Sequence, residues 1–85
     1  MSPALTSDGA IPAKYRELIA LSVALTTQCS YCLDVHTRQA LEAGATREEL
    51  GETIFIAAAP RAGAAVGPGL LVQKIADAAT KPASA

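Results

Sequence analysis

The segment from Pro12 to Gln28 is apolar on almost every side of the helix that it should form. Proline suits the first position of a helix, because the amide hydrogen that it lacks would have no partner there. A helix that is apolar nearly all round must be buried on more than one side. A chain of 85 residues can hardly supply that much cover alone, so we expect a partner subunit to provide part of it. The apolar residues concerned are Leu18, Ile19, Leu21, Val23, Ala24 and Leu25.

Composition favours an all-α fold. Alanine accounts for 19 of the 85 residues, and the only aromatic residues are Tyr15, Tyr31 and Phe55. Alanine is the best helix former, and the β-branched and aromatic residues that favour strands are sparse. We therefore expect a single domain over residues 1–85, built from about four helices, with flexible tails at 1–11 and 80–85.

Charge and hydropathy disfavour two classes of function. Seven Lys and Arg residues nearly balance eight Asp and Glu residues, for a net charge of −1. A protein that binds nucleic acid or an anionic membrane needs a strongly basic surface. The uninterrupted apolar runs are much shorter than the roughly 18 residues of a membrane span, and residues 1–10 have no basic and apolar leader. We therefore expect a cytoplasmic protein that binds neither nucleic acid nor membranes.

Two local signals place the next helices. Residues 30–43 predict a second helix, and Gly44 supplies the left-handed residue that often ends one. Thr46 and Glu49 have the spacing of a capping box, which marks the start of a third helix. Along that helix, residues that should face the core recur at helical spacing: Leu50, Thr53, Ile54, Ala57 and Ala58.

Pro60 should end or kink the third helix, because proline lacks an amide hydrogen and clashes with the preceding turn. Residues 61–69 then hold three glycines and one proline, and the helical pattern is weakest there. A fourth helix is predicted over residues 70–79, or from residues 62–64 with a weak turn at 67–69 within it. Three of its residues should face the core: Leu71, Ile75 and Ala79.

The residues that can carry chemistry lie close together in the sequence. Cys29-Ser30-Tyr31-Cys32 is a CxxC motif, and His36 follows its second cysteine by four residues. Residues four apart on a helix differ by about 40° around the axis and about 6 Å along it, so Cys32 and His36 can meet. Cys29 lies one turn earlier, at the start of the helix, within reach of Cys32 for a disulfide. The helix dipole favours a thiolate there, and the imidazole can take its proton.

We favour a redox-active dithiol over two alternatives. In a zinc site, Cys29, Cys32 and His36 would supply three ligands where a closed site needs four, so Glu17 or another chain would have to complete it. The second alternative is a pair of inert, buried cysteines. A c-type haem is excluded, because its attachment needs a histidine directly after the second cysteine. We therefore expect neither a metal nor a cofactor.

Glu17 is the one acidic residue in the apolar first helix. It is either an exposed member of a charged cluster with Lys14 and Arg16, or a carboxylate turned toward the thiols. If the first two helices form an antiparallel hairpin, Glu17 lies roughly level with Gln39, about one turn beyond His36. A glutamate side chain and one water molecule could span that gap.

Together, Glu17, Cys29, Cys32 and His36 form the pattern E-x11-C-x2-C-x3-H, which resembles the core of alkylhydroperoxidase D (AhpD). The flanking segments 16–21 and 40–49 agree with this. The chain therefore resembles a short member of the AhpD-like branch of the carboxymuconolactone decarboxylase superfamily, over about residues 12–60. The resemblance implies an all-helical, obligate homotrimer or homohexamer, with the cysteines in a cleft near the subunit contacts.

The resemblance also implies an enzyme, either a thiol-dependent peroxidase or a related disulfide oxidoreductase. It implies that Cys32 is the activated thiol, that His36 assists it, that Glu17 joins a proton relay through water and that Cys29 is the resolving thiol. The helix dipole alone would favour Cys29 as the attacking group, whereas the histidine spacing favours Cys32. The implied partners are a hydroperoxide and an external dithiol, either a lipoylated or a thioredoxin-like protein. A decarboxylase-like protein of other activity and a zinc-binding or structural helical oligomer stay open as alternatives.

Overall fold

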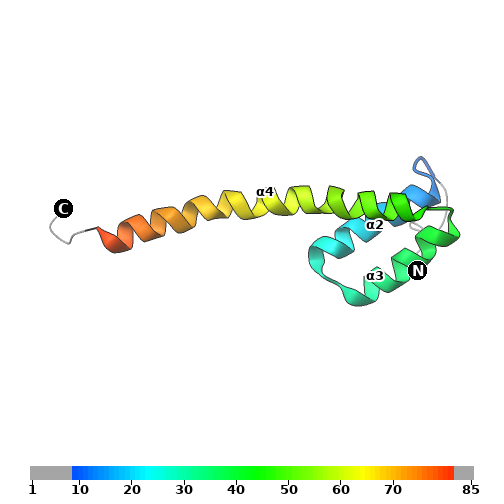
Figure 1. Ribbon diagram of the computed structural model, residues 1–85, viewed down its shortest axis with the longest axis horizontal. Helices are drawn as coiled ribbons and strands as arrows, with labels where there is room; N and C mark the ends of the chain where they lie inside the picture. Colours follow the sequence, from blue (N-terminus) through cyan, green and yellow to red (C-terminus); the bar gives the residue numbers. More distant parts are fainter. Residues whose placement is uncertain (1–8, 82–85) are drawn as a thin grey trace.

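Three helices follow one another in the computed structural model, which describes residues 9–81 (Figure 1). They are α2 from Ala13 to Thr27, α3 from Ser30 to Glu42 and α4 from Arg47 to Thr80. The described residues contain no strand, so the predicted all-α fold class is confirmed. The predicted tails lie mainly outside the described residues, although Thr80 still belongs to α4.

Helices α2 and α3 form an antiparallel hairpin. Pro12 is the residue just before α2, and two residues, Gln28 and Cys29, connect the helices. Gln28 takes the left-handed conformation, with φ of 57°, and ends α2 by donating its amide hydrogen to the carbonyl of Ala24. So short a connection turns the chain back at once, which brings the inner face of α3 against α2.

The start of α4 follows the predicted signals. Gly44 has φ of 98°, the left-handed region that glycine enters without steric cost. The Thr46 hydroxyl accepts a hydrogen bond from the Glu49 amide at 3.1 Å, and the Glu49 carboxylate accepts one from the Thr46 amide at 2.8 Å. This confirms the predicted capping box. Glu49 also pairs with Lys14 of α2 at 3.0 Å, which ties the beginning of α4 to the beginning of the hairpin.

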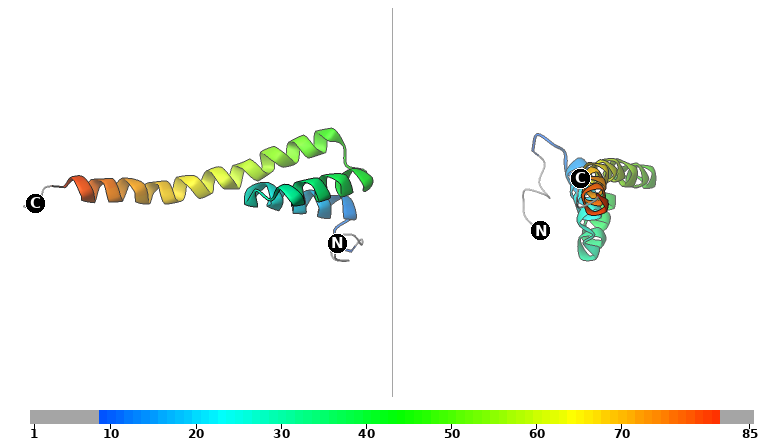
Figure 2. Two further views of the ribbon diagram at one scale, coloured as in Figure 1. Left: turned by 90° about the horizontal axis from the view of Figure 1, so that it is seen from below. Right: turned by 90° about the vertical axis from the view of Figure 1, so that its left-hand side faces the viewer.

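The prediction of separate third and fourth helices is wrong, because α4 runs without a break through Pro60 and Pro68. Each proline removes one helical hydrogen bond and leaves one carbonyl without its donor. Apart from the half-buried Gly69, the residues around both prolines are exposed, so water can satisfy those carbonyls. Nearby alanines such as Ala59 and Ala65 are strong helix formers, although Pro68 itself lies between two glycines. Figure 2 shows the result, a helix that bends gently between its two halves and continues.

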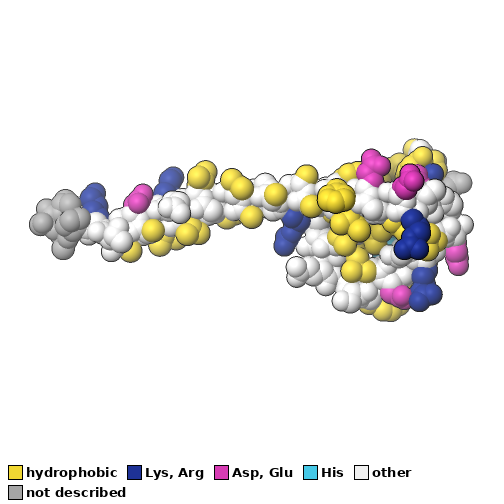
Figure 3. Space-filling model, in the orientation of Figure 1, with side chains coloured by type: hydrophobic (Ala, Val, Ile, Leu, Met, Phe, Trp, Pro, Cys, Tyr) yellow, Lys and Arg dark blue, Asp and Glu magenta, His cyan; other side chains and the backbone are white. Residues whose placement is uncertain are grey.

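Only the first part of α4 packs against the hairpin. Thr53 and Ala57 are buried against α2, whereas residues 58–81 are exposed except for Gly69, which is half-buried. The expected inward orientation of Leu71, Ile75 and Ala79 is therefore wrong within this chain, because no element lies beside them (Figure 1). We call residues 58–81 the arm, and Figure 3 shows apolar side chains along it.

The arm makes the molecule long and leaves its core small. The chain measures 65 × 25 × 25 Å, with a radius of gyration of 19.3 Å, whereas a compact chain of this length would have about 12 Å. Among the described residues, the buried apolar side chains are one leucine and four alanines: Leu21, Ala24, Ala40, Ala45 and Ala57. So small a core leaves large apolar side chains of the described residues exposed, among them Ile19, Val23 and Ile54.

Because α4 is unbroken, its length and hydropathy reach those of a membrane-spanning helix. Among the described residues it is the one helix that is long and apolar enough to cross a membrane by length and composition, with a mean hydropathy of 1.4 over its most apolar window. The uninterrupted apolar runs in the sequence are shorter, because Arg61 and the prolines divide them. A helix that is buried inside a soluble assembly has the same length and composition, so the property does not by itself assign α4 to a membrane.

Candidate functional site

The two cysteines begin helix α3. Cys29 is its N-cap, with extended backbone angles, and its sulfur accepts a hydrogen bond from the Cys32 amide at 3.3 Å. The cap places the Cα atoms of Cys29 and Cys32 5.2 Å apart, within the range for a disulfide, and the two sulfurs are bonded to each other. The CxxC motif can therefore exist as a disulfide in this fold, at the positive end of the α3 dipole.

His36 and Glu17 form a buried pair across the hairpin. Nδ1 of His36 lies 2.7 Å from Oε2 of Glu17. The Glu17 residue is 2% exposed and the His36 residue 8% exposed, so the contact is shielded from water. A buried polar group needs a hydrogen-bond partner, and these two side chains supply each other with one. The sequence left open whether Glu17 is exposed or turned inward, and the structure shows that it is turned inward. Its carboxylate contacts His36 directly, without a bridging water.

Gln39 completes this polar cluster. With its side-chain nitrogen turned toward α2, the Gln39 amide donates to Oε1 and Oε2 of Glu17 at 2.9 and 3.1 Å. Gln39 lies one turn beyond His36 on the same face of α3, so both side chains can form hydrogen bonds with the Glu17 carboxylate. The helical register of the sequence predicted Gln39 to lie level with Glu17, but Gln39 was not among the predicted site residues. The antiparallel register was the signal that could have identified it.

Cys32 and His36 line one pocket, of about 370 Å³, on the surface of the hairpin. We call it the redox pocket. One wall of the redox pocket is formed by residues along a single face of α2: Arg16, Ile19, Ala20, Val23, Ala24 and Thr27. Cys29 is not part of this lining, so of the two cysteines Cys32 is the one that borders the pocket together with His36.

The structure thus brings together the side chains that the sequence singled out, in two linked groups. Cys29 and Cys32 are bonded at the start of α3, and Glu17 and His36 are bonded across the hairpin. Cys32 and His36 share the redox pocket and so join the groups. The two other residues of the motif, Ser30 and Tyr31, are exposed, Tyr31 to 79%.

The zinc interpretation finds no ligand set in residues 9–81. No three His, Cys, Asp or Glu side chains among them are grouped so that they could hold a metal ion. Both sulfurs are engaged in the disulfide, and Glu17 is directed at the far nitrogen of the imidazole. A tetrahedral site would need two free thiolates and a fourth ligand directed at the same point.

The described residues thus define an all-α protein whose helical hairpin carries a CxxC motif at its turn and a buried Glu–His pair between its helices. The chain belongs to the carboxymuconolactone decarboxylase family, whose family model matches residues 1–79. It is 43% identical over 65 residues to the uncharacterized protein 4 in the cox locus of Paracoccus denitrificans, covering 76% of this chain and 59% of that protein. It is 47% identical over 53 residues to an uncharacterized protein of Cupriavidus necator, covering 62% of this chain and 47% of that protein. The chain thus spans about half the length of these curated relatives.

Proposed function

We propose that this chain is a thiol-dependent peroxidase of the AhpD-like type, which reduces hydroperoxides by cycling Cys29 and Cys32 between dithiol and disulfide. The observation that carries the proposal is the position of Cys32 beside His36 in one pocket, with the Glu17 carboxylate on the far side of the imidazole. A thiol, a base and a group that orients the base are the parts that activated nucleophiles require.

The proposed proton path begins at Cys32. Because Nδ1 of His36 is engaged by Glu17, Nε2 is the ring nitrogen left for the pocket. A carboxylate on Nδ1 favours the tautomer with its proton there, so that Nε2 is free to accept one. We propose that Nε2 takes the Cys32 proton, and that Glu17 and the α3 dipole stabilise the resulting ion pair.

The first half-reaction consumes the hydroperoxide. The Cys32 thiolate attacks the terminal oxygen of R–O–O–H, a sulfur–oxygen bond forms and the O–O bond breaks. The alkoxide leaves as the alcohol ROH after it takes the proton from His36, and Cys32 becomes a sulfenic acid. Cys29 then attacks the Cys32 sulfur as a thiolate, and the hydroxyl group departs as water. The products are one alcohol, one water and the disulfide.

The second half-reaction restores the dithiol. An external dithiol attacks the disulfide, passes through a mixed disulfide and leaves as its own disulfide, so two electrons and two protons return to the cysteines. A lipoylated or thioredoxin-like protein has the required chemistry. This step needs a sulfur that the reductant can approach, and both cysteines are half-buried rather than sealed.

Intact mass after mild oxidation tests the proposal. The reduced protein, treated with one equivalent of cumene hydroperoxide, should lose two hydrogens and regain them with dithiothreitol. Cys29→Ser should instead gain one oxygen, which dimedone traps as the sulfenic acid, and Cys32→Ser should not change. Ser30→Ala is the matched control, since Ser30 is an exposed neighbour of both cysteines. An unchanged mass of the wild-type protein with both thiols alkylatable would overturn the proposal.

The same experiment separates peroxidase from disulfide oxidoreductase activity. If the disulfide forms with oxidised glutathione or a protein disulfide at least as fast as with hydroperoxides, the chain is a disulfide oxidoreductase. If cumene hydroperoxide is faster by orders of magnitude, it is a peroxidase. Cys32→Ser should abolish turnover in either case.

We also propose that a second copy of this chain covers the arm. An isolated helix with two prolines and three glycines is not stable in water, so the arm needs a packing partner. The hairpin has an apolar surface that needs cover as well, because Ile19 and Val23 on α2 are 52% and 55% exposed. One chain therefore has two apolar surfaces, each of which has no neighbour among residues 9–81.

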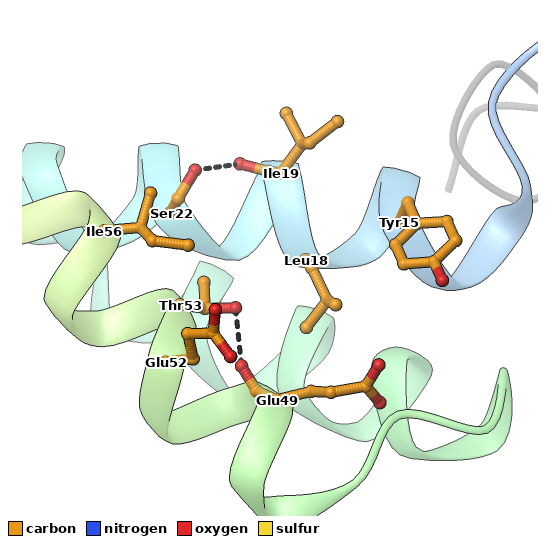
Figure 4. A pocket seen from close by; sticks show the side chains of 8 residues that line it. All are labelled: Tyr15, Leu18, Ile19, Ser22, Glu49, Glu52, Thr53 and Ile56. Atoms are coloured by element: carbon orange, nitrogen blue, oxygen red, sulfur yellow. Dashed lines mark hydrogen bonds between the residues drawn. The ribbon is translucent and has the colours of Figure 1, made fainter.

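A groove between α2 and α4 fits this proposal. It has a volume of about 370 Å³, and Figure 4 shows Leu18 directed into it. Glu49 and Glu52 line it, and Glu49 is already paired with Lys14, which leaves Glu52 as the carboxylate that a second copy could meet. The arm carries Arg61, Lys74 and Lys81 against one acidic residue, Asp77, so its net charge is opposite to that of Glu52. Ile19 lines both this groove and the redox pocket. A second copy seated here would therefore extend the wall of the redox pocket.

A further inference from the structure

Gln39 is the member of the buried polar cluster that the proposed proton path does not use. Its side-chain nitrogen reaches both oxygens of the Glu17 carboxylate, Oε1 at 2.9 Å and Oε2 at 3.1 Å. Neither Gln39 nor Glu17 is part of the lining of the redox pocket, which Cys32 and His36 share. Any effect of Gln39 on the Cys32 thiol must therefore pass through Glu17 and His36.

The Glu17 carboxylate needs more than one contact to keep its orientation. The Glu17 side chain is 3% exposed, and Nδ1 of His36 engages one of its oxygens, Oε2. A carboxylate that is held at one oxygen can still turn about that contact. The Gln39 amide approaches from one turn further along α3 and spans both oxygens, so the two contacts together fix the carboxylate plane.

The donors around Glu17 fit one arrangement of protons. An ionised carboxylate accepts hydrogen bonds and donates none, whereas an amide nitrogen only donates them. With the Gln39 nitrogen against both oxygens, a proton on Oε1 would meet another donor. The two hydrogen bonds are also strongest when their acceptor is charged. All three side chains are satisfied when Glu17 is ionised and Nδ1 of His36 carries the ring proton, which leaves Nε2 free to accept one.

We infer that Gln39 is a positioning residue of the redox pocket, whose amide fixes the Glu17 carboxylate so that His36 presents an unprotonated Nε2 to Cys32. This inference rests on the proposed peroxidase function and adds a residue to its proton path. Without the amide, the carboxylate can turn away from Nδ1. The imidazole can then adopt the other tautomer, in which Nε2 carries the proton and cannot take the one from Cys32.

The imidazole itself gives the readout, because the chain contains one histidine. The protein is produced with isotope-labelled histidine, kept as the disulfide and titrated with base until the ring is neutral. The NMR shifts of the two ring nitrogens then identify the tautomer. The wild-type protein should carry the proton on Nδ1. Gln39→Met keeps the volume of the side chain and removes its donors, so this variant should show a mixture of both tautomers.

The rate of thiol oxidation is measured on the same proteins after reduction. With cumene hydroperoxide, Gln39→Met should react roughly 10-fold more slowly than the wild type, the lower end for a lost side chain that orients a reactive group. Gln39→Asn should have the same two effects, because it keeps the amide but retracts it by one methylene. Combined with Glu17→Gln, Gln39→Met should cause no further loss of rate, because the two residues act through one path.

Arg38→Met is the matched control. Arg38 is the next residue along α3, but it is exposed and pairs with Asp34 at 3.0 Å, away from the Glu–His pair. This variant should keep the wild-type tautomer and the wild-type rate. Circular dichroism shows whether each variant is folded before it is compared, and either Gln39 variant is sufficient for the test.

The outcomes separate this inference from the proposed function. A wild-type ring that is protonated on Nε2 overturns it. If the Gln39 variants keep the proton on Nδ1 and react at the wild-type rate, the peroxidase stands and the positioning role is wrong. The role is also wrong if the rate falls while the tautomer does not change, which is the result of a purely structural loss. If the tautomer responds as expected but hydroperoxide leaves the wild-type thiols unoxidised, the peroxidase proposal fails and Gln39 still positions the Glu–His pair.

Discussion

Glu17→Gln should separate the support that this carboxylate gives to the fold from its part in the redox pocket. The Glu17 oxygens accept from Nδ1 of His36 at 2.7 Å and from the Gln39 amide at 2.9 and 3.1 Å. Glu17→Ala would leave the buried His36 and the half-buried Gln39 amide without an acceptor, at up to about 1–3 kcal/mol each. The combined loss of roughly 2–6 kcal/mol is comparable with the whole stability of a small domain, about 5–15 kcal/mol. Glu17→Ala therefore tests what this side chain contributes to stability, and Glu17→Gln is needed to test its part in the proton path.

Glutamine keeps the shape of Glu17 and one acceptor oxygen. That oxygen can accept from Gln39 while the new amide donates to Nδ1 of His36. The imidazole then carries its proton on Nε2, and the nitrogen that we propose as the base can no longer accept one. We expect the free energy of unfolding to fall by about 1 kcal/mol, while the rate of peroxide reduction falls by about 10²- to 10⁴-fold, the range for a lost general base.

Two measurements on the same samples check this prediction. Urea unfolding followed by circular dichroism gives the free energy, and cumene hydroperoxide consumption with dithiothreitol gives the rate. Glu42→Gln is the control, because this exposed carboxylate at the end of α3 lies outside the redox pocket and the groove between α2 and α4, and it should change neither quantity. A Glu17→Gln protein that turns over at the wild-type rate would refute the proton path. A Glu17→Ala protein as stable as the wild type would refute the energetic reasoning.

Three further predictions concern the capping box and the arm. Thr46→Ala should lower the free energy of unfolding by about 1 kcal/mol, whereas Thr46→Ser should restore the cap, as urea midpoints would record. The hydrogen bond from the Thr46 amide and the nearby Lys14 hold the pKa of Glu49 below its ordinary value of 4.5. Because the folded state then binds fewer protons than the unfolded state, this carboxylate stabilises the fold above pH 4.5, and the contribution is lost as the pH falls through the folded pKa. The Tm advantage of the wild type over Glu49→Gln should therefore shrink in acid, and an advantage that grows there would contradict the assignment. Combining Leu71→Lys with Ile75→Lys should convert an oligomer into monomers by light scattering. A wild-type chain that is monomeric at micromolar concentrations, or that floats with lipid vesicles, would show that no second copy covers the arm.

Short-range signals predicted the elements around the site well. The capping box of Thr46 and Glu49 and the positive φ of Gly44 appear where the sequence placed them. Both features depend on residues within four positions of each other, so the local sequence is sufficient to specify them. The position of Cys32 and His36 on one side of α3 is likewise specified locally, because helix geometry places residues four apart on the same face.

Long-range contacts were predicted less completely. The sequence placed Glu17 near the level of Gln39 but could not decide between an exposed and an inward carboxylate. That choice depends on how α2 is rotated about its own axis when it packs against α3. The prediction that α4 would be divided failed for a related reason. The cost of a proline in a helix depends on whether water can reach the carbonyl that it frees, and burial is a property of the folded chain.

By itself, the sequence determined the helical fold class, the helix that begins at the CxxC motif and the short-range geometry of Cys32 and His36. These follow from propensities and spacings that act within one or two turns of a helix. Only the tertiary structure decided that Glu17 is buried against His36, that Arg16 shares a pocket with Cys32 and that the arm leaves the hairpin uncovered. Each of these features depends on which helix faces pack together and which stay exposed to water. That choice is made by contacts between residues that are far apart in the sequence.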